Sequence, residues 1–302
     1  MIGDSTGTSK SRFGIVAQDI DIAGGRVGVL LVHGLGGTPV EFRYFADGLA
    51  AAGLSVSVPL LYGHGGSDAL LNTTTWRDWY GTVVEAHDAL KAKCDVIIAG
   101  GLSVGALLAL HLACERPKDV HATMLFSPTF WPNGWAIPRA FILFKLFVRQ
   151  KWFANLFHLR EVPPYGIKDE RIRRFVLDSL QNDADRRSLD DIFGRRGGTI
   201  LEFRWLADLV KKELGGIRQP ALIFHPRQDD QSDLSNTIFL QRALGGLVET
   251  VVLDDSYHMV TLDRQRALVV ARAVDFAASL EIGDRTQLPP SGLRVPSGEA
   301  KT

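Results

Sequence analysis

Residues of three types that together activate a serine hydroxyl occur in order along this chain. Ser103 lies in the middle of a Gly-x-Ser-x-Gly motif, two aspartates (Asp229 and Asp230) follow an apolar segment, and His258 follows a later one. A serine hydroxyl becomes a nucleophile when a nearby base takes its proton, and a histidine base needs an acid that fixes its tautomer. We therefore expect Ser103 as nucleophile and His258 as base. The acid is Asp229 or Asp230, since either could instead cap the next segment.

The residues on either side of Ser103 indicate how it is held. Residues 95–100 form an apolar segment typical of a strand, and residues 106–115 are strong helix formers. A Gly-x-Ser-x-Gly motif between a strand and a helix predicts a nucleophile elbow, a turn so tight that Gly101 and Gly105 must be small. The elbow holds the serine on strained backbone, with its hydroxyl close to a helix N-terminus.

A second glycine-rich turn, His33–Gly37, follows an aliphatic run. Glycines in such a turn let backbone N–H groups point at the negative charge that develops on a substrate oxygen. We therefore assign the backbone N–H groups of Leu35 and Val104 to an oxyanion hole. Losing one such donor typically costs on the order of a hundredfold or more in rate.

Three residues of the glycine-rich turns are expected to bind the substrate: His33, Gly34 and His64. Neither histidine is expected to do chemistry. We expect His33 to orient the oxyanion loop through hydrogen bonds, and His64 to pin its own turn.

Strand-like and helix-like segments alternate along most of the chain. This order predicts an α/β fold, with right-handed crossovers and a mostly parallel central sheet that has helices on both faces. Ser103, Asp229 and His258 each follow a strand-like segment, so we expect them at the same sheet edge, where such folds bind ligands. The expected strands are 27–32, 54–61, 95–100, 122–127, 221–226 and 249–253, and the expected helices are 39–52, 76–93, 106–115 and 262–280.

Residues 129–215 interrupt this alternation, because they contain helix-like pieces and no clear strand. We expect them to form a helical cap over the sheet edge, inserted into a hydrolytic core made of residues 13–128 and 216–283. The cap is rich in aromatic side chains, which first of all pack a small helical layer. Some of them must face Ser103, and we expect Trp131, Phe141 and Phe144 to line an apolar acyl pocket.

Composition limits the classes of partner. The 34 basic residues balance 34 acidic ones, which removes the electrostatic argument for nucleic acid or an anionic membrane. Two cysteines are too few for a disulfide framework, and their spacing does not suit a metal site. The longest apolar stretch, near residues 136–148, contains Pro138, Arg139 and Lys145, so no membrane-spanning helix is predicted. Residues 1–12 and 284–302 are polar and expected to be disordered, and without a secretory signal a cytoplasmic location is expected.

The motifs as a set resemble the α/β-hydrolase superfamily. They are His33–Gly37, Gly63-His64-Gly65, Gly101–Gly105, Arg227–Asp230 and Ser256-Tyr257-His258. Within that superfamily, residues 59–65, Trp76–Trp79 and residues 256–263 are similar to the bacterial carboxylesterase and monoacylglycerol lipase branch. The resemblance covers roughly residues 25–128 and 218–280 and does not extend to the cap. Tyr257 stands where the branch often has glycine.

The resemblance implies the reaction. It makes Asp229 the acid and predicts hydrolysis of carboxylic esters through an acyl-enzyme on Ser103, with no metal or organic cofactor. The expected partner is a small ester with an apolar acyl chain; no partner protein is indicated. Thioesterase, amidase, acyltransferase or carbon–carbon hydrolase activity would use the same residues, and a ligand receptor that keeps the fold is the alternative outside enzymes.

Overall fold

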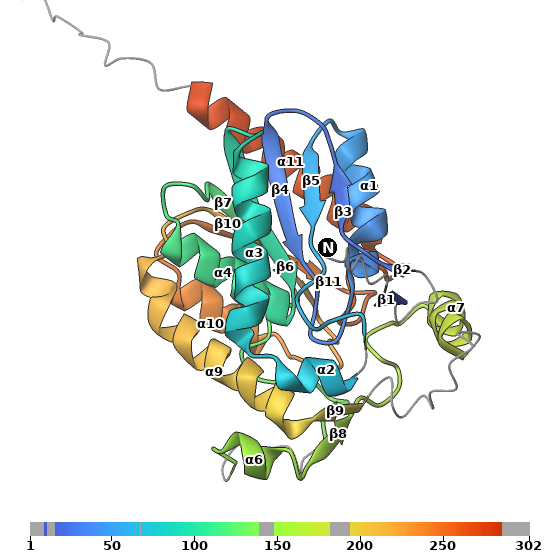
Figure 1. Cartoon of the computed structure of the whole chain (residues 1–302). Coiled ribbons are helices and arrows are strands. Elements are labelled where there is room, and N and C mark those ends of the chain that lie inside the picture. Colours follow the sequence, from blue (N-terminus) through green and yellow to red (C-terminus); the bar gives the residue numbers. More distant parts are fainter. Residues whose placement is uncertain (1–8, 11–15, 67, 139–147, 182–193, 286–302) are drawn as a thin grey trace, which may run out of the picture.

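The central sheet of the molecule has seven strands in the order β11-β10-β7-β6-β4-β5-β3. The computed structural model describes residues 9–10, 16–66, 68–138, 148–181 and 194–285. Neighbouring strands of the sheet run parallel, except that β3 is antiparallel to β5. Helices lie in front of and behind the sheet (Figure 1). The expected α/β architecture, with a mostly parallel sheet covered on both faces, is thus confirmed.

The strands are short apolar segments that are buried because helices cover both faces. Every residue of β4 is buried, and so is every residue of β7 and β10. The edge strand β3 has three residues, which is too few to give a pattern in the sequence. The strands of the sheet are β3 (Ile20–Ile22), β4 (Val27–Val32), β5 (Ser55–Val58), β6 (Val96–Leu102), β7 (Ala122–Phe126), β10 (Ala221–Pro226) and β11 (Val248–Leu253).

Two helices show how the sequence sets their bounds. The helix α3 begins at a capping box, in which Thr75 and Asp78 each accept a hydrogen bond from the other's backbone N–H. The helix α4 is apolar on all sides and lies in the interior, as expected for a helix without a polar face. The helices are η1 (Pro39–Phe42), α1 (Arg43–Ala51), α2 (Asp68–Thr73), α3 (Trp76–Lys91), α4 (Val104–Glu115), α6 (Lys151–Ala154), α7 (Glu170–Gln181), α9 (Gly197–Glu213), η2 (Leu214–Gly216), α10 (Ser235–Ala243) and α11 (Arg266–Arg285).

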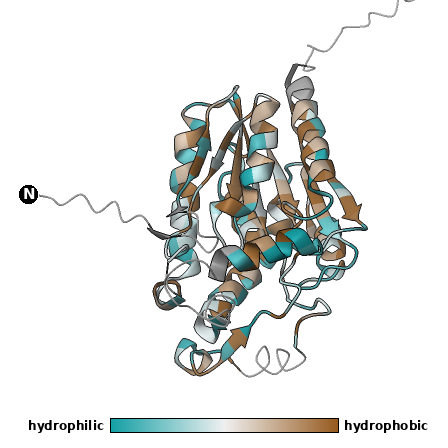
Figure 2. Ribbon diagram, turned by 90° about the vertical axis from the view of Figure 1, so that its right-hand side faces the viewer, coloured by the Kyte–Doolittle hydropathy of each residue, from teal (hydrophilic) through white to brown (hydrophobic). Residues whose placement is uncertain are grey.

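The sheet separates two apolar clusters. The first packs α3, α4 and α9 on one face and includes Trp79, which is fully buried. The second packs α1 and α11 on the other face, where Phe126 stacks on Phe224 and meets Phe42 and Phe45 edge to face. In Figure 2 the strands between these layers are brown, while teal lies on the outer parts of the helices. The sheet is thus a rigid support for the loops at its edge.

The cap differs from the expected helical layer. Its described part contains α6, α7 and a two-stranded antiparallel sheet of β8 (His158–Arg160) and β9 (Gly194–Arg196). The helix α9 falls inside the predicted cap, residues 129–215, yet Phe203, Leu206 and Val210 pack in the same cluster as α4. The apolar face of α9 therefore covers the sheet, and the cap in the narrower sense lies between residue 129 and the start of α9. Figure 1 shows β8, β9, α6 and α7 beyond one end of the strands.

Two further points concern the ends of the chain and the membrane. A short antiparallel pair, β1 (Ser9–Lys10) and β2 (Val16–Ala17), precedes the central sheet. Of the two tails predicted to be disordered, residues 1–12 and 284–302, all but residues 9–10 and 284–285 lie outside the described residues. Among the described helices, none is long and apolar enough to cross a bilayer.

Candidate active site

Ser103 occupies a strained turn between β6 and α4. Its φ is +56° and its ψ is −112°, a conformation that costs free energy for any residue other than glycine. The flanking glycines are required by close packing, since a Cβ on Gly101 would lie 2.3 Å from the carbonyl oxygen of Gly105. A Cβ on Gly105 would lie 2.0 Å from the carbonyl oxygen of Val32, in the neighbouring strand β4. The strand–turn–helix context that the motif predicts is therefore present.

The histidine pairs with the first of the two aspartates. Nδ1 of His258 lies 3.0 Å from Oδ1 and 2.9 Å from Oδ2 of Asp229, and both side chains are buried. The Asp229 carboxylate also accepts hydrogen bonds from the backbone N–H groups of Gln231 and Ser232, at 2.8 and 2.9 Å. Asp230 makes no such contact with the imidazole. Its carboxylate instead accepts a hydrogen bond from the backbone N–H of His258, at 3.3 Å.

The electrostatics of this pair follow from burial and mutual attraction. Burial on its own would raise the pKa of Asp229, but the charge and hydrogen bond of His258 outweigh it and lower that pKa below its usual value. Burial on its own would lower the pKa of His258, but the charge and hydrogen bond of Asp229, helped by Asp230, outweigh it and raise that pKa. For Asp230, burial is the largest effect and raises the pKa of its carboxyl.

In this structure the Ser103 hydroxyl is bonded to a threonine. Its Oγ donates to Oγ1 of Thr129, at 3.3 Å. Nε2 of His258 is buried and has no hydrogen-bond partner among the described residues. Ser103 and His258 both line the same cavity. Proton transfer from Ser103 to His258 therefore requires the serine hydroxyl to turn away from Thr129.

The segment Ser127–Thr129 touches all three loops that carry these side chains. Oγ of Ser127 donates to the carbonyl oxygen of His258 at 2.7 Å, and Oγ1 of Thr129 lies 3.0 Å from Oγ of Ser232, next to Asp229. Ser127 has a φ of +44°, so strained backbone follows β7 as it does β6. The motif analysis did not find this segment, because Ser-Pro-Thr after a strand carries no specific signal.

The loop after β4 is held by polar side chains on both sides. The backbone N–H of Gly34 donates to Oε2 of Glu41 at 3.0 Å, and the Arg195 guanidinium lies where a Cβ on Gly36 would be. Gly36 has a φ of +69°, so both its conformation and this close approach require glycine. Gly34, Leu35 and Val104 line the cavity, as expected for the oxyanion turn. Glu41 and Arg195 also line it and are residues that the sequence did not single out.

The two histidines predicted near the substrate pack against this loop and are not among the residues that line the cavity. Nδ1 of His33 bonds the carbonyl oxygen of Gly34 at 2.9 Å, and its Nε2 accepts a hydrogen bond from the N–H of Leu61 at 3.1 Å. This pattern requires a neutral ring, and burial lowers the pKa of His33 to about 4. The His64 ring lies edge-on to His33 and Trp79, and burial lowers its pKa as well. Both therefore support the loop, and the predicted substrate contact of each is corrected.

The cap aromatics predicted to line the pocket divide into two groups. Trp131 is not among the lining residues; its ring packs on Phe130 and Phe239, and its Nε1 lies 3.3 Å from Oγ of Ser235. Its backbone N–H bonds Asn236, which fastens it to the core beside α10. Phe141 and Phe144 lie outside the described residues.

The cavity itself has a volume of about 630 Å³, the size of a small-molecule site. Most of the side chains around it are apolar and come from the cap. Those of the cap are Ile137, Pro138, Val148, Phe153, Phe157, Leu159, Val176 and Leu177, while α9 adds Ile200 and Phe203 and the histidine loop adds Met259. Arg160, Glu161 and Arg173 add charge from the cap side. The arrangement brings a strained serine and a histidine–aspartate pair to the wall of a largely apolar chamber.

Comparison with known proteins identifies the family. The family model Hydrolase_4, described as serine aminopeptidase S33, matches residues 26–265. The chain belongs to this family. A thermostable monoacylglycerol lipase from Bacillus sp. (strain H-257) is 30% identical over 257 residues, which are 84% of this chain and 91% of the relative.

Similar solved structures agree with this family assignment. A structure from work on LipS and LipT, two metagenome-derived lipolytic enzymes, is 26% identical, with a TM-score of 0.70 over 87% of this chain and 98% of that one. A soluble variant of monoglyceride lipase from Saccharomyces cerevisiae shares the fold, with a TM-score of 0.68 and 15% identity over 87% of this chain and 91% of that one. The expectation of an α/β-hydrolase in the lipase and esterase branch, an ester-cleaving serine hydrolase, is confirmed.

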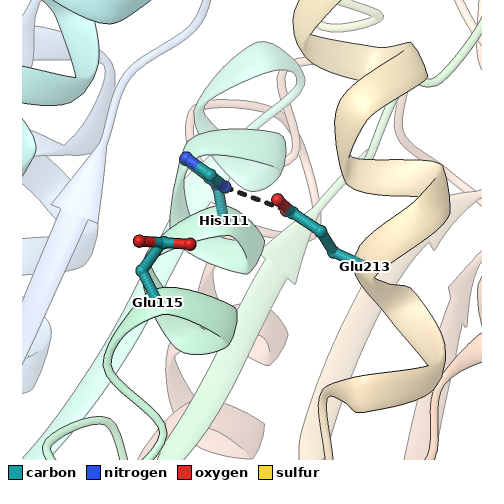
Figure 3. A group of neighbouring side chains, drawn as sticks. All are labelled: His111, Glu115 and Glu213. Carbon is teal, nitrogen blue, oxygen red and sulfur yellow. Dashed lines mark hydrogen bonds and ion pairs between the residues drawn. The ribbon is translucent and has the colours of Figure 1, made fainter.

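A second group of polar side chains in this hydrolase lies away from the elbow. His111 and Glu115 on α4 and Glu213 on α9 point toward one another, as Figure 3 shows, and could together supply three ligand atoms to a metal ion. Nδ1 of His111 is already hydrogen-bonded to Glu213, at 2.9 Å. His111 is two helical turns from Ser103, about 12 Å along the axis of α4. This group ties α9 to α4 and takes no part in the catalytic arrangement.

Proposed function

We propose that the chain cleaves carboxylic esters with Ser103 as nucleophile, His258 as general base and acid, and Asp229 as the acid that orients the imidazole. The observation that carries the proposal is the buried bond between Nδ1 of His258 and Asp229, in a histidine that lines the same cavity as the strained Ser103. With Nδ1–H donated to a carboxylate, Nε2 is the nitrogen that can accept a proton.

The reaction then has two halves. The Ser103 oxygen attacks the acyl carbon as Nε2 of His258 takes its proton, and the backbone N–H groups of Leu35 and Val104 hold the oxyanion. The tetrahedral intermediate collapses as His258 returns the proton to the leaving alcohol, which leaves an acyl group on Ser103. A water molecule gives a proton to the same nitrogen and attacks the acyl-enzyme. His258 then returns this proton to Oγ of Ser103 as the acyl–oxygen bond breaks, which releases the acid and restores the serine.

We propose lipid-like esters with a medium or long apolar acyl chain, including monoacylglycerols, as the substrate class. The apolar lining of the cavity supports this, because an acyl chain gains free energy by leaving water for such a surface. The similarity to a monoacylglycerol lipase over most of the chain supports it too. Phe141 and Phe144 remain predicted acyl contacts.

The decisive experiment compares Ser103→Ala with wild type. We expect the variant to lose p-nitrophenyl ester hydrolysis and fluorophosphonate labelling while its melting temperature stays close to that of wild type. Ser279→Ala, at an exposed position on α11, is the matched control and should keep both activities. Ester turnover retained by Ser103→Ala would refute the assignment, and an unlabelled Ser103 in folded wild type would favour a receptor.

Substrate class is tested separately, with a panel of acyl chain lengths on glycerol and simple alcohols. Matching thioesters and aminoacyl amides belong in the same panel, because the same three residues could cleave them. We expect kcat/KM to rise with chain length for esters. Higher kcat/KM on thioesters or amides than on esters would assign the chain to one of those classes instead.

A further inference from the structure

A glycine of the cap packs directly against the catalytic histidine. Gly166 lies in the segment between β8 and α7 and has a φ of +76°. A Cβ added there would lie 3.2 Å from Cβ of His258 and 2.8 Å from Cγ of Met259. Both the left-handed conformation and the lack of space therefore require glycine at this position.

The same glycine is hydrogen-bonded to the histidine loop on both sides of its backbone. Its N–H donates to Oδ2 of Asp230 at 2.8 Å, and its carbonyl oxygen accepts from the N–H of Met259, also at 2.8 Å. The other carboxylate oxygen of Asp230 accepts from the N–H of His258. Asp230 thus bridges the cap and the histidine loop through two backbone N–H groups, and its side chain is buried.

We propose that Gly166 and Asp230 are positioning residues for His258, so that the cap places the catalytic imidazole from one side as Asp229 does from another. The inference rests on the proposed function, since it concerns the histidine of the proposed triad. It assigns the second aspartate of the Asp229-Asp230 pair a task of its own. Asp230 holds backbone rather than the imidazole, and takes no proton from it.

The packing of Gly166 against the histidine loop is tested by comparison with a second glycine. That glycine has the same left-handed backbone conformation but no close neighbours. Gly53 has a φ of +88° and no atom within 4 Å of an added Cβ, so Gly53→Ala reproduces the strain of Gly166→Ala without the contact. We expect Gly53→Ala to lose the thermal stability that the backbone strain costs, and Gly166→Ala to lose more, because its Cβ also crowds Met259 and His258. Gly166→Ala alone should lower kcat and the rate of fluorophosphonate labelling, by on the order of tenfold or more, because small displacements of catalytic groups are costly. Equal kcat in the two variants would overturn the inference.

Charge is tested with Asp230→Asn. Among the described residues, Asp229, Asp230 and Glu161 each favour the imidazolium of His258 through their negative charge, and the buried His225 also interacts with it electrostatically. Removing the charge of Asp230 should therefore move the acidic limb of the kcat/KM profile to lower pH. In addition, kcat should fall, because the NH2 group that replaces one carboxylate oxygen cannot accept a hydrogen bond from its backbone N–H. The control is Asp254→Asn, at an exposed position paired with Arg227, which should shift neither. An unshifted limb together with an unchanged kcat would contradict the role of Asp230.

The two proposals fail in different ways. If folded wild type is not labelled at Ser103, the triad itself is wrong. If wild type is labelled and Gly166→Ala matches Gly53→Ala, only the role of the cap is wrong. Should Gly166→Ala not fold, the limb shift and kcat of Asp230→Asn decide the matter.

Discussion

Two adjacent carboxylates meet one histidine, and their surroundings give them opposite properties. Asp229 contacts the imidazole and two backbone N–H groups, which favour its charged form and lower its pKa. Asp230 is buried beside that charge, which together with desolvation raises its pKa. The Asp229 carboxylate therefore holds a firm negative charge against Nδ1 of His258. That charge keeps Nδ1 protonated and Nε2 available as a base.

The pH dependence of Asp229→Asn tests this reading. In the proposed mechanism the general base is neutral His258, so activity should rise with pH through its pKa, which Asp229 raises above the usual value. Replacing the carboxylate with an amide should lower kcat by roughly 10³- to 10⁴-fold, as loss of the orienting acid does in other serine hydrolases. The acidic limb of kcat/KM should move to lower pH. The measurement is a pH–rate profile on a p-nitrophenyl ester.

Asp275→Asn, at an exposed position on α11, should leave both kcat and the limb as in wild type. The assignment of the two aspartates would be reversed if Asp229→Asn kept a near-normal kcat and a folded Asp230→Asn lost most of it.

At the scale of elements, the elbow depends on how closely α4 approaches β4. The Gly105 position faces the carbonyl oxygens of Val32 and His33, at 2.0 and 2.7 Å from a Cβ built there. Backbone in the centre of a sheet cannot move aside cheaply. The loop after β4 carries Leu35 and α4 begins at Val104, so a displaced α4 disturbs both donors of the proposed oxyanion hole.

Gly105→Ala should therefore lower the free energy of unfolding by about 3 kcal/mol or more, because overpacking a rigid site is costly. Ester hydrolysis should fall with it. Gly81→Ala, in α3, is the control, because a Cβ added there meets no atom within 4 Å. It should stabilise the protein by up to about 1 kcal/mol, since alanine is more favourable than glycine in a helix interior. Urea unfolding and kcat measure both variants. A Gly105→Ala protein as stable and active as wild type would disprove the tight contact.

The sequence predicted the elements whose signals are local. Apolar composition alone predicts the strands β4 and β6 and the helix α4. The glycines between β6 and α4 predict the turn that joins them. The pair β8 and β9 could not be predicted, because each strand has only three residues, most of them polar, and its partner is more than thirty residues away.

The site was predictable to the extent that motifs report it. Ser103 and His258 each stand in a specific pattern, whereas the choice between Asp229 and Asp230 depends on which carboxylate reaches the ring. Thr129 contacts Ser232, which is more than a hundred residues away, and Gly166 belongs to the cap and contacts His258. No local sequence pattern can predict such long-range contacts. Trp131 is not among the residues that line the cavity, and the sequence could not show this, because nearness to a motif does not show on which side of a loop a ring packs.

Across the whole molecule, the cap is fastened to the core at the histidine loop. The carboxylate of Asp263 is fully buried and accepts four backbone hydrogen bonds, of 2.7 to 2.9 Å. Two come from Lys168 and Asp169 in the cap, one from Tyr257, and one from Arg264. Together with the bonds of Gly166, they make one connected unit of this cap segment and the loop that carries His258.

The buried histidines make the stability of the whole chain depend on pH. The pKa of His33 is about 4 in the folded protein, against an ordinary value of 6.5, so between these pH values the unfolded chain binds a proton that the folded chain does not. The stability that His33 contributes is complete above pH 6.5 and is lost as pH falls toward 4. The loss amounts to about 3 kcal/mol from this residue, and the lowered pKa values of His64 and Asp229 act in the same direction.

We therefore expect His33→Gln to be less stable than wild type at pH 7, because the bonds to Gly34 and Leu61 are weakened, but to lose less stability on acidification. The difference between pH 7 and pH 4 in the free energy of unfolding should shrink by about 3 kcal/mol. His158→Gln, at an exposed position in β8, should keep the wild-type difference. Urea titrations at a series of pH values measure all three proteins. Parallel curves of unfolding free energy against pH for wild type and His33→Gln would mean that folding does not lower the pKa of His33. The hydrogen bonds of a neutral His33 ring would then not be what holds the loop after β4.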